Sequence, residues 1–300
     1  MQINLNGLTT ESINPATREL DKQSAYRIAE LINEEDQKVA LAVKTQLTQI
    51  GEAIDAIVER MKRGGRLIYM GAGTSGRLGV VDASECPPTY GVSSDLVVSL
   101  IAGGHDAMFQ AQENVEDSEE LGREDLKNIN VTECDVVCAI AASGRTPYCI
   151  GGLNYAHEVG AKTLTVCCNP GSPMTKLADI AIVPEVGPEV VSGSTRMKAG
   201  TSQKLVLNML STGTMVKMGK VYGNLMVDVQ ATNKKLIVRC ENIVMQATGV
   251  SRDEAQEVLA KSGGKVKLAI CMILTGMNST DAQAALDKAD GHLREVLEAK

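Results

Sequence analysis

Short apolar segments alternate with longer polar segments between residues 65 and 185, and this alternation restricts the fold more than any other feature of the sequence. Five segments are nearly continuous in apolar side chains, as is typical of parallel strands that are buried on both faces. They are LIYMG (67–71), LVVSLIAG (96–103), DVVCAIAA (135–142), TLTVCC (163–168) and IAIVPE (180–185). The polar segments between them have the length of helices. We therefore predict an α/β fold with a doubly wound sheet of five parallel strands.

Helical patterns flank this region on both sides. Before it, AYRIAELINEED and VALAVKTQLTQIGEAIDAIVERMKRGG predict helices that end at a Gly-Gly pair. After it, another long helix is expected over residues 196–220. We divide the chain into an N-terminal helical segment packed on the core (1–56), the α/β domain (57–220), a connecting helix (221–239) and a small three-helix domain (240–300).

The composition argues against several classes of partner. The net charge is −7 and the isoelectric point is near 5.2, whereas contacts to nucleic-acid phosphates require a basic surface. No apolar run approaches the roughly 20 residues that span a bilayer. The first residues, MQINLNGLTTESINPATREL, lack the basic and apolar regions of a signal peptide. We expect a cytoplasmic protein that binds neither nucleic acid nor membrane.

The cysteines and histidines do not form a metal-binding pattern. None of the eight cysteines belongs to a C-x-x-C motif, and the three histidines are scattered at positions 105, 157 and 292. In an acidic intracellular chain, such cysteines are expected to be small buried hydrophobic residues rather than disulfides. We predict no metal site.

Two similar loops follow the first and third predicted strands. The sequences YMGAGTSGR and AIAASGRTPY both carry S-G-R after a strand and before a helix. A helix N-terminus offers free N–H groups and a positive dipole end, so it favours an anion. Hydroxyl groups of Thr74, Ser75, Ser143 and Thr146 add donors at the same edge of the sheet. The pair of loops predicts a site for a phosphoryl group, although either loop alone could be an ordinary turn.

The first loop also matches the dinucleotide-binding pattern G-x-G-x-x-G. That function requires an acidic residue about 20 residues further on, at the end of the second strand. The acidic residue found there, Asp106, lies about 30 residues beyond the loop, which is too far for the dinucleotide-binding pattern. The sequence therefore favours a phosphorylated substrate over a nicotinamide cofactor, and we expect no cofactor.

The hydroxyl-rich loops resemble those of the SIS fold, a flavodoxin-like domain that binds sugar phosphates. The segment GPEVVSGSTRMKAGT (187–201) is similar to a signature shared by bacterial N-acetylmuramic acid 6-phosphate etherases and the glucokinase regulatory protein. Together with GAGTSGRLGVVDASECPPTYG (71–91) and IAASGRTPY (140–148), it is most similar to the etherases. The resemblance covers essentially the whole chain and implies that the three-helix C-terminal domain is UBA-like.

This resemblance implies a lyase without a cofactor. It would cleave the ether bond of N-acetylmuramic acid 6-phosphate to give N-acetylglucosamine 6-phosphate and D-lactate in cell-wall recycling. The sugar ring opens, and the carbon-1 aldehyde acidifies the proton on carbon 2. A base removes that proton, lactate leaves with the help of an acid, and water adds to the double bond.

The resemblance also implies the catalytic residues. Glu85, in ASECPP, matches the proton donor of the family, and its apolar neighbours favour a desolvated carboxylic acid. Glu116, in ENVEDS, matches the second catalytic position. Without the resemblance, Glu85 would be interpreted as a helix cap and Glu116 as part of a solvated helix face.

The same resemblance implies a set of substrate-binding residues. Within the strand-end loops and the 71–91 segment these are Thr74, Ser75, Ser84, Ser143, Arg145 and Thr146. Arg196 and Lys198, in STRMKAG, either add positive charge to the site or form structural ion pairs. SIS domains usually pair, so a homodimer with its site near the subunit interface is expected.

Two other functions share these features. A non-catalytic sensor of sugar phosphates, like the glucokinase regulatory protein, would need the same loops, although the presence of both Glu85 and Glu116 favours the enzyme. An aldose–ketose isomerase would share the proton abstraction but would release no lactate.

Overall fold

The computed structural model describes residues 9–229 and 234–299. The chain forms two compact units, each made of two segments. The first unit contains Met1–Ser84 and Asp95–Ser211, and the second contains Glu85–Ser94 and Thr212–Lys300. Two of the unit boundaries fall inside long helices, α3 (Gly73–Tyr90) and α7 (Lys198–Lys217), and the third lies between Ser94 and Asp95.

The predicted five-stranded parallel sheet is confirmed. Its strands are β1 (Leu67–Gly71), β2 (Val97–Ile101), β3 (Val136–Ile140), β4 (Lys162–Val166) and β5 (Ile180–Ile182). They pair in the order β2-β1-β3-β4-β5, and every pair is parallel. Gly71 is opposite both Ile101 and Ile140, so the first three strands end at the same level. The strand order reverses between β1 and β3, which is where ligands bind in such sheets.

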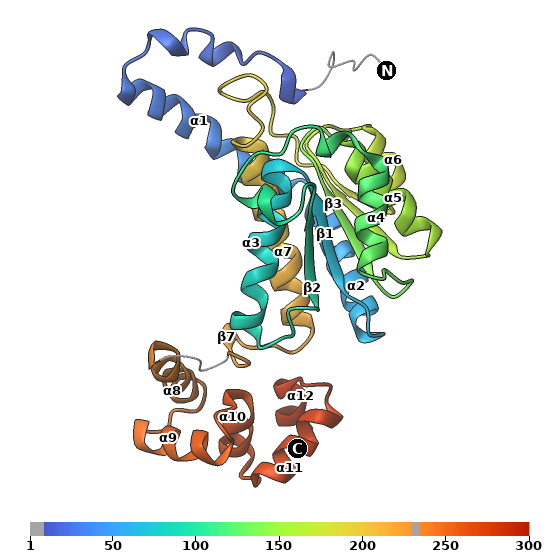
Figure 1. Cartoon of the computed structure of the whole chain (residues 1–300). Coiled ribbons are helices and arrows are strands. Elements are labelled where there is room, and N and C mark those ends of the chain that lie inside the picture. The colour runs from blue at the N-terminus through green and yellow to red at the C-terminus, as the bar shows by residue number, and fades with distance from the viewer. Residues whose placement is uncertain (1–8, 230–233, 300) are drawn as a thin grey trace. The chain divides into compact units, whose positions relative to one another are not determined.

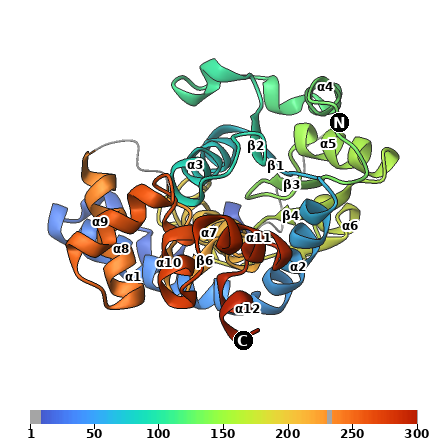
Figure 2. The same cartoon turned by 90° about the horizontal axis from the view of Figure 1, so that it is seen from below.

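Helices cover both faces of the sheet (Figure 1). One face packs against α4 (Glu119–Asn128), α5 (Pro147–Glu158) and α6 (Pro173–Leu177) through a buried cluster that includes Ile68, Val137 and Leu153. Both views show α4 and α5 side by side (Figures 1 and 2). On the other face lie α2 (Leu47–Lys62), α3 and α7. The hydroxyl of Tyr69 on β1 donates to Asp82 on α3 at 2.9 Å, which holds that helix on the sheet.

The N-terminal segment of the first unit contributes short 3₁₀ turns and one long helix. The turns are η1 (Thr9–Glu11), η2 (Pro15–Thr17) and η3 (Leu20–Lys22), and α1 (Ala25–Lys44) follows a Ser24 cap. The Asn169 amide, in the loop after β4, accepts from the Thr9 N–H at 2.9 Å and donates to the Thr10 hydroxyl at 3.0 Å. This pairing brings η1 to the carboxyl end of the sheet.

The second unit differs from the predicted connecting helix and three-helix domain. Residues 221–226 form a hairpin of β6 (Val221–Tyr222) and β7 (Leu225–Met226), because Gly223 and Asn224 make a turn between two apolar pairs. Of the remaining predicted connecting helix, 230–233 lie outside the described residues. Residues 227–229 form no helix, and 234–239 belong to α8 (Lys234–Thr248), which continues past the predicted boundary.

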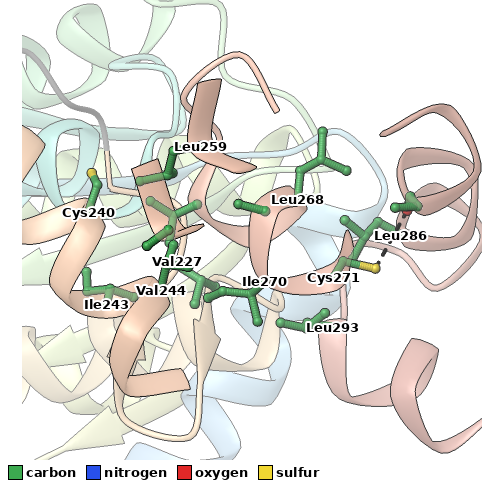
Figure 3. Close-up of a cluster of buried hydrophobic side chains, with 14 of the residues drawn as sticks. Val227, Cys240, Ile243, Val244, Leu259, Leu268, Ile270, Cys271, Leu286 and Leu293 are labelled. Carbon is green, nitrogen blue, oxygen red and sulfur yellow. Dashed lines mark hydrogen bonds between the residues drawn. The ribbon is translucent and has the colours of Figure 1, made fainter. Parts of the chain in front are cut away.

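Four more helices follow α8, so the described C-terminal residues contain five helices instead of three. They are α9 (Arg252–Lys261), α10 (Val266–Thr275), α11 (Ser279–Lys288) and α12 (Leu293–Glu298). Their apolar faces share one buried cluster, with Ile270 and Cys271 of α10 between Val244 and Leu286 (Figure 3). Across both units, the described helices are all too short or too polar to cross a bilayer.

Candidate functional site

A cavity of about 410 Å³ lies at the carboxyl ends of β1 and β3, and we call it the sheet-edge cavity. It is lined by both strand-end loops, by two acidic residues that precede α4, and by parts of the N-terminal segment and of the loop before α7. The lining residues with polar or charged side chains are Glu11, Thr74, Ser75, Glu116, Asp117, Ser143, Arg145, Thr146 and Thr195. Six of the ten residues predicted for the site are therefore brought together here.

The first loop connects β1 directly to α3. The backbones of Gly71 and Gly76 approach so closely that a Cβ atom at Gly76 would lie 2.6 Å from the Gly71 carbonyl oxygen. Only glycine permits this tight turn, which places the first turn of α3 at the cavity. Ser75 is 8% exposed, and its hydroxyl donates to Oε1 of Gln203 on α7 at 2.9 Å. Thr74 is the less buried hydroxyl of the pair.

The second loop connects β3 to α5. Gly144 has a φ of +66°, and a Cβ atom there would lie 2.1 Å from the Ser172 hydroxyl oxygen. The Ser143 hydroxyl accepts from the Arg145 N–H at 3.2 Å, which closes the turn. Thr146 is the N-cap residue of α5, but its side chain makes no capping hydrogen bond. The N-terminal N–H groups of α5 therefore receive no hydrogen-bond acceptor from the side chain of their cap residue, and a bound anion could accept from them instead.

The carboxylates of the cavity come from two different segments. Glu116 and Asp117 lie on the 3₁₀ turn η5 (Val115–Asp117), ahead of α4, and both are exposed at the mouth of the cavity they line. Glu11 lies on η1. Glu11, Asp117 and Thr195 line the cavity but were not predicted as site residues. Thr195 stands within the STRMKAG motif and could have been found there, whereas no local pattern marks Glu11.

Glu85 and Ser84 do not line the sheet-edge cavity. Both are exposed on α3, about three turns after the helix begins at Gly73. The expected desolvation of Glu85 is wrong for the single chain. Its apolar neighbour Cys86 faces the protein interior and is 3% exposed, whereas the Glu85 side chain is exposed to solvent. The Ser84 hydroxyl donates to the Val81 carbonyl of its own helix at 2.9 Å.

Arg196 and Lys198 also lie outside the cavity lining. Arg196 is exposed, whereas Lys198 is 1% exposed and its Nζ atom lies 2.6 Å from Oε2 of Glu35 on α1. Lys198 was predicted either to add positive charge to the site or to form a structural ion pair, and the structure shows the ion pair. Glu189 accepts from the N–H groups of Lys198 and Ala199, both at 2.9 Å, and so caps α7. These contacts fix the loop that carries Thr195.

A second cavity, of about 610 Å³, lies within the second unit, and three of its five charged lining residues are paired with one another. Asp228 contacts Lys267 at 2.7 Å and Lys220 at 3.3 Å. None of the predicted site residues lines it. The sheet-edge cavity is therefore the better candidate for a catalytic site.

Comparison with known domain families agrees with the observed sheet. Residues 49–157 match the family described as the glucokinase regulatory protein N-terminal SIS domain, and residues 110–213 match the SIS domain. A solved Bacteroides fragilis protein, described as a phosphosugar isomerase involved in capsule formation, is 24% identical. It covers 66% of this chain and 94% of its own, with a TM-score of 0.50. The fold is the SIS fold, as the sequence predicted.

Curated relatives match over the full length. Proteins named N-acetylmuramic acid 6-phosphate etherase from Clostridium beijerinckii and Vibrio vulnificus are each 58% identical. The first match covers 99% of this chain and 97% of the relative, and the second covers 100% of both. The Photorhabdus laumondii protein of the same name is 55% identical over 100% of this chain and 99% of its own. The chain belongs to the family of N-acetylmuramic acid 6-phosphate etherases.

Proposed function

We propose that this protein is a lyase that cleaves the D-lactyl ether of N-acetylmuramic acid 6-phosphate with water. The products are N-acetylglucosamine 6-phosphate and D-lactate, and the activity serves cell-wall recycling in the cytoplasm. One observation carries the proposal beyond family membership: Glu116 lines the same cavity as the two hydroxyl-rich loops. The cavity therefore combines a carboxylate with hydroxyl groups that are suited to binding a phosphate.

The 6-phosphate binds where α3 and α5 begin. Both helices present N–H groups at their first turns, and their dipoles favour an anion there. Thr74, Ser75, Ser143 and Thr146 supply hydroxyl groups, and Arg145 supplies a positive charge. The carboxylates of Glu11, Glu116 and Asp117 repel an anion, so the phosphate lies on the loop side of the cavity.

The reaction requires an acid and a base but no change of oxidation state in the protein. The base removes the proton from carbon 2 of the open-chain sugar, the carbon 3–oxygen bond breaks, and a double bond forms between carbons 2 and 3. Water then adds, its oxygen to carbon 3 and a proton to carbon 2. Glu116 acts at the proton on carbon 2, because it shares the cavity with the phosphate loops. Glu85 protonates the leaving lactate oxygen.

Glu85 acts in a homodimer, in the site of the other subunit. It does not line the cavity of its own chain, and it is exposed one turn after Val81, an apolar residue that is 55% exposed. Large apolar side chains are also exposed on α1, where Tyr26 is 77% and Leu41 is 66% exposed. An interface that covers such side chains would gain hydrophobic free energy and would remove Glu85 from water.

The sensor alternative is not favoured, because the full-length relatives are named etherases. The experiment that separates the two measures D-lactate release from N-acetylmuramic acid 6-phosphate in chelator-treated buffer. We expect release by the wild type and a loss of about 10²- to 10⁴-fold in Glu116→Gln and in Glu85→Gln. Calorimetry with N-acetylglucosamine 6-phosphate checks that both variants still bind a sugar phosphate. A wild type that binds this sugar phosphate but releases no lactate would be a sensor.

A further inference from the structure

A third cavity, of about 420 Å³, adjoins the sheet-edge cavity, and we call it the Arg77 cavity. The two cavities share four lining residues, which are Ala72, Gly73, Glu116 and Asp117. The rest of the Arg77 cavity is lined by Arg77, three alanines (Ala102, Ala107 and Ala111) and the segment 112–115. Glu116 thus lies at the boundary between a cavity rich in hydroxyl groups and a cavity that contains an arginine.

The guanidinium group of Arg77 is held in place but is not neutralised. Its Nε atom donates to the carbonyl oxygens of Ala107 at 3.0 Å and Met108 at 3.1 Å, both in the 3₁₀ turn η4 (His105–Met108). Across residues 9–229 and 234–299, no carboxylate pairs with Arg77, and its Nη1 and Nη2 atoms form no hydrogen bond. An arginine carries five N–H donors, so four of them remain for a ligand. Their planar arrangement matches a carboxylate.

The substrate of the proposed reaction carries two anions in its open chain. The phosphate is on carbon 6, and the carboxylate belongs to the lactyl group on carbon 3. The proton on carbon 2 and the bond that breaks at carbon 3 lie beside the lactyl group and several bonds from the phosphate. A base that acts on carbon 2 must therefore lie between two anion-binding sites, closer to the site for the lactyl group.

We propose that the Arg77 cavity binds the lactyl group, with the Arg77 guanidinium on its carboxylate and the alanines around its methyl group. With the phosphate at the two loops, this arrangement brings carbons 2 and 3 to Glu116. The inference rests on the proposed function and adds the subsite that selects a lactyl ether. Glu113 and Asp117 also line this cavity, so a carboxylate would be repelled there without Arg77. Hexose phosphates that lack the lactyl group make no contact with Arg77 and so gain no binding free energy from this cavity.

The test compares two ligands that differ only in the lactyl group. Lactate release gives kcat and KM for N-acetylmuramic acid 6-phosphate, and inhibition of that reaction gives Ki for N-acetylglucosamine 6-phosphate. In Arg77→Gln, we expect KM to rise about 10- to 100-fold while Ki changes by less than about 2-fold. Arg77→Lys should lie between Arg77→Gln and the wild type, because an ammonium keeps the charge but loses the two-point contact.

A second variant keeps Arg77 and its contacts to η4. Ala111 is exposed and lines the same cavity, so Ala111→Leu narrows the cavity with little effect on the fold. It should raise KM and leave Ki unchanged, as Arg77→Gln does. An equal loss of affinity for both ligands, or no change in KM for both variants, would overturn the inference.

The Arg77 subsite can be tested even if the protein releases no lactate. If the wild type releases no lactate, the proposed function fails, and calorimetry then measures the two affinities directly. A preference for the lactyl ether that is present in the wild type and absent in Arg77→Gln would still support the Arg77 subsite. If lactate is released but Arg77→Gln keeps the wild-type KM, only the subsite is wrong.

Discussion

The Nζ atom of Lys198 lies 2.6 Å from Oε2 of Glu35, and this ion pair joins the first residue of α7 to the middle of α1. Both side chains are almost completely buried, with Lys198 1% and Glu35 5% exposed. Lys38, on the surface, contacts the other oxygen of Glu35 at 2.5 Å. A buried pair of this kind is costly to break, because a single charge would remain without its partner.

Removal of one partner should therefore destabilise the fold more than removal of both. We expect Lys198→Met to lower the free energy of unfolding by about 3 kcal/mol, since Glu35 then loses its buried cation and keeps only its contacts with Lys38 and Asn14. The double variant Glu35→Leu/Lys198→Met should recover most of this loss. Urea denaturation of both variants measures the difference. A single variant as stable as the wild type would mean that the pair contributes nothing.

The same pair predicts how stability depends on pH. Burial alone would raise the pKa of Glu35, but hydrogen bonds from Lys198 and Lys38 outweigh it and lower the pKa from 4.5 to about 2. Since the folded pKa lies below the unfolded one, the stabilisation is present above pH 4.5 and is lost as the pH falls towards 2. Glu35→Gln should flatten this part of the stability curve, as measured by urea denaturation at several pH values. Identical acid slopes for the two proteins would contradict the assignment.

The turn after β3 gives a test of the phosphate site with a matched control. Gly144 and Gly171 have nearly equal φ angles, +66° and +67°, but only at Gly144 would a Cβ atom meet another atom within 4 Å. Gly171→Ala should cost about 1–2 kcal/mol of stability and keep the affinity for N-acetylglucosamine 6-phosphate. Gly144→Ala should also displace the loop and weaken that affinity more than about 10-fold. Equal affinities of the two variants, measured by calorimetry, would argue against a phosphate at this loop.

The cysteines should differ sharply in reactivity. Seven of the eight are buried and only Cys134 is partly accessible. Burial raises the pKa of Cys149 and of Cys168 to about 12, so these thiols do not ionise near neutral pH. At pH 8 a disulfide reagent should therefore modify one thiol rapidly in the folded protein. Cys134→Ser should remove that rapid phase, and a rapid phase that survives this change would show that another cysteine is accessible.

Much of the fold could be predicted because the signals for the sheet are local. Each strand is a short apolar run, and Gly71, Gly76 and Gly144 mark the turns that bring two loops to one edge. The hairpin at 221–226 was missed because its strands have two residues each, too few for a periodic pattern.

The site could be predicted only in part, since several of its contacts join distant segments. Glu35 and Lys198 are 163 positions apart, and nothing near either residue predicts the other. Glu11 reaches the cavity because Asn169, far away in sequence, binds the turn that carries it. Arg77 is the arginine of the first S-G-R motif, but neither its contacts to η4 nor the cavity it lines can be predicted from that motif.

The proposed role of Glu85 in the partner subunit predicts complementation between two inactive variants. In a mixed dimer of Glu85→Gln and Glu116→Gln, one site combines both variant residues and the other combines both wild-type residues. Random pairing makes half of the dimers mixed, so about one quarter of the wild-type lactate release should return. Each variant alone should stay inactive.

The control for this experiment is a mixed dimer of two variants that are both changed at residue 85. Glu85→Gln mixed with Glu85→Ala cannot form a site with a wild-type Glu85, so it should release no lactate under any pairing. Subunits are combined by co-expression with two different tags, and dimers that carry both tags are isolated, so the mixed Glu85→Gln/Glu116→Gln dimer should then show about one half of the wild-type activity. If this mixed dimer is as inactive as its parents while it still binds N-acetylglucosamine 6-phosphate, then Glu85 does not act across the subunit interface. The acid would then have to come from the cavity that already holds Glu11, Glu116 and Asp117.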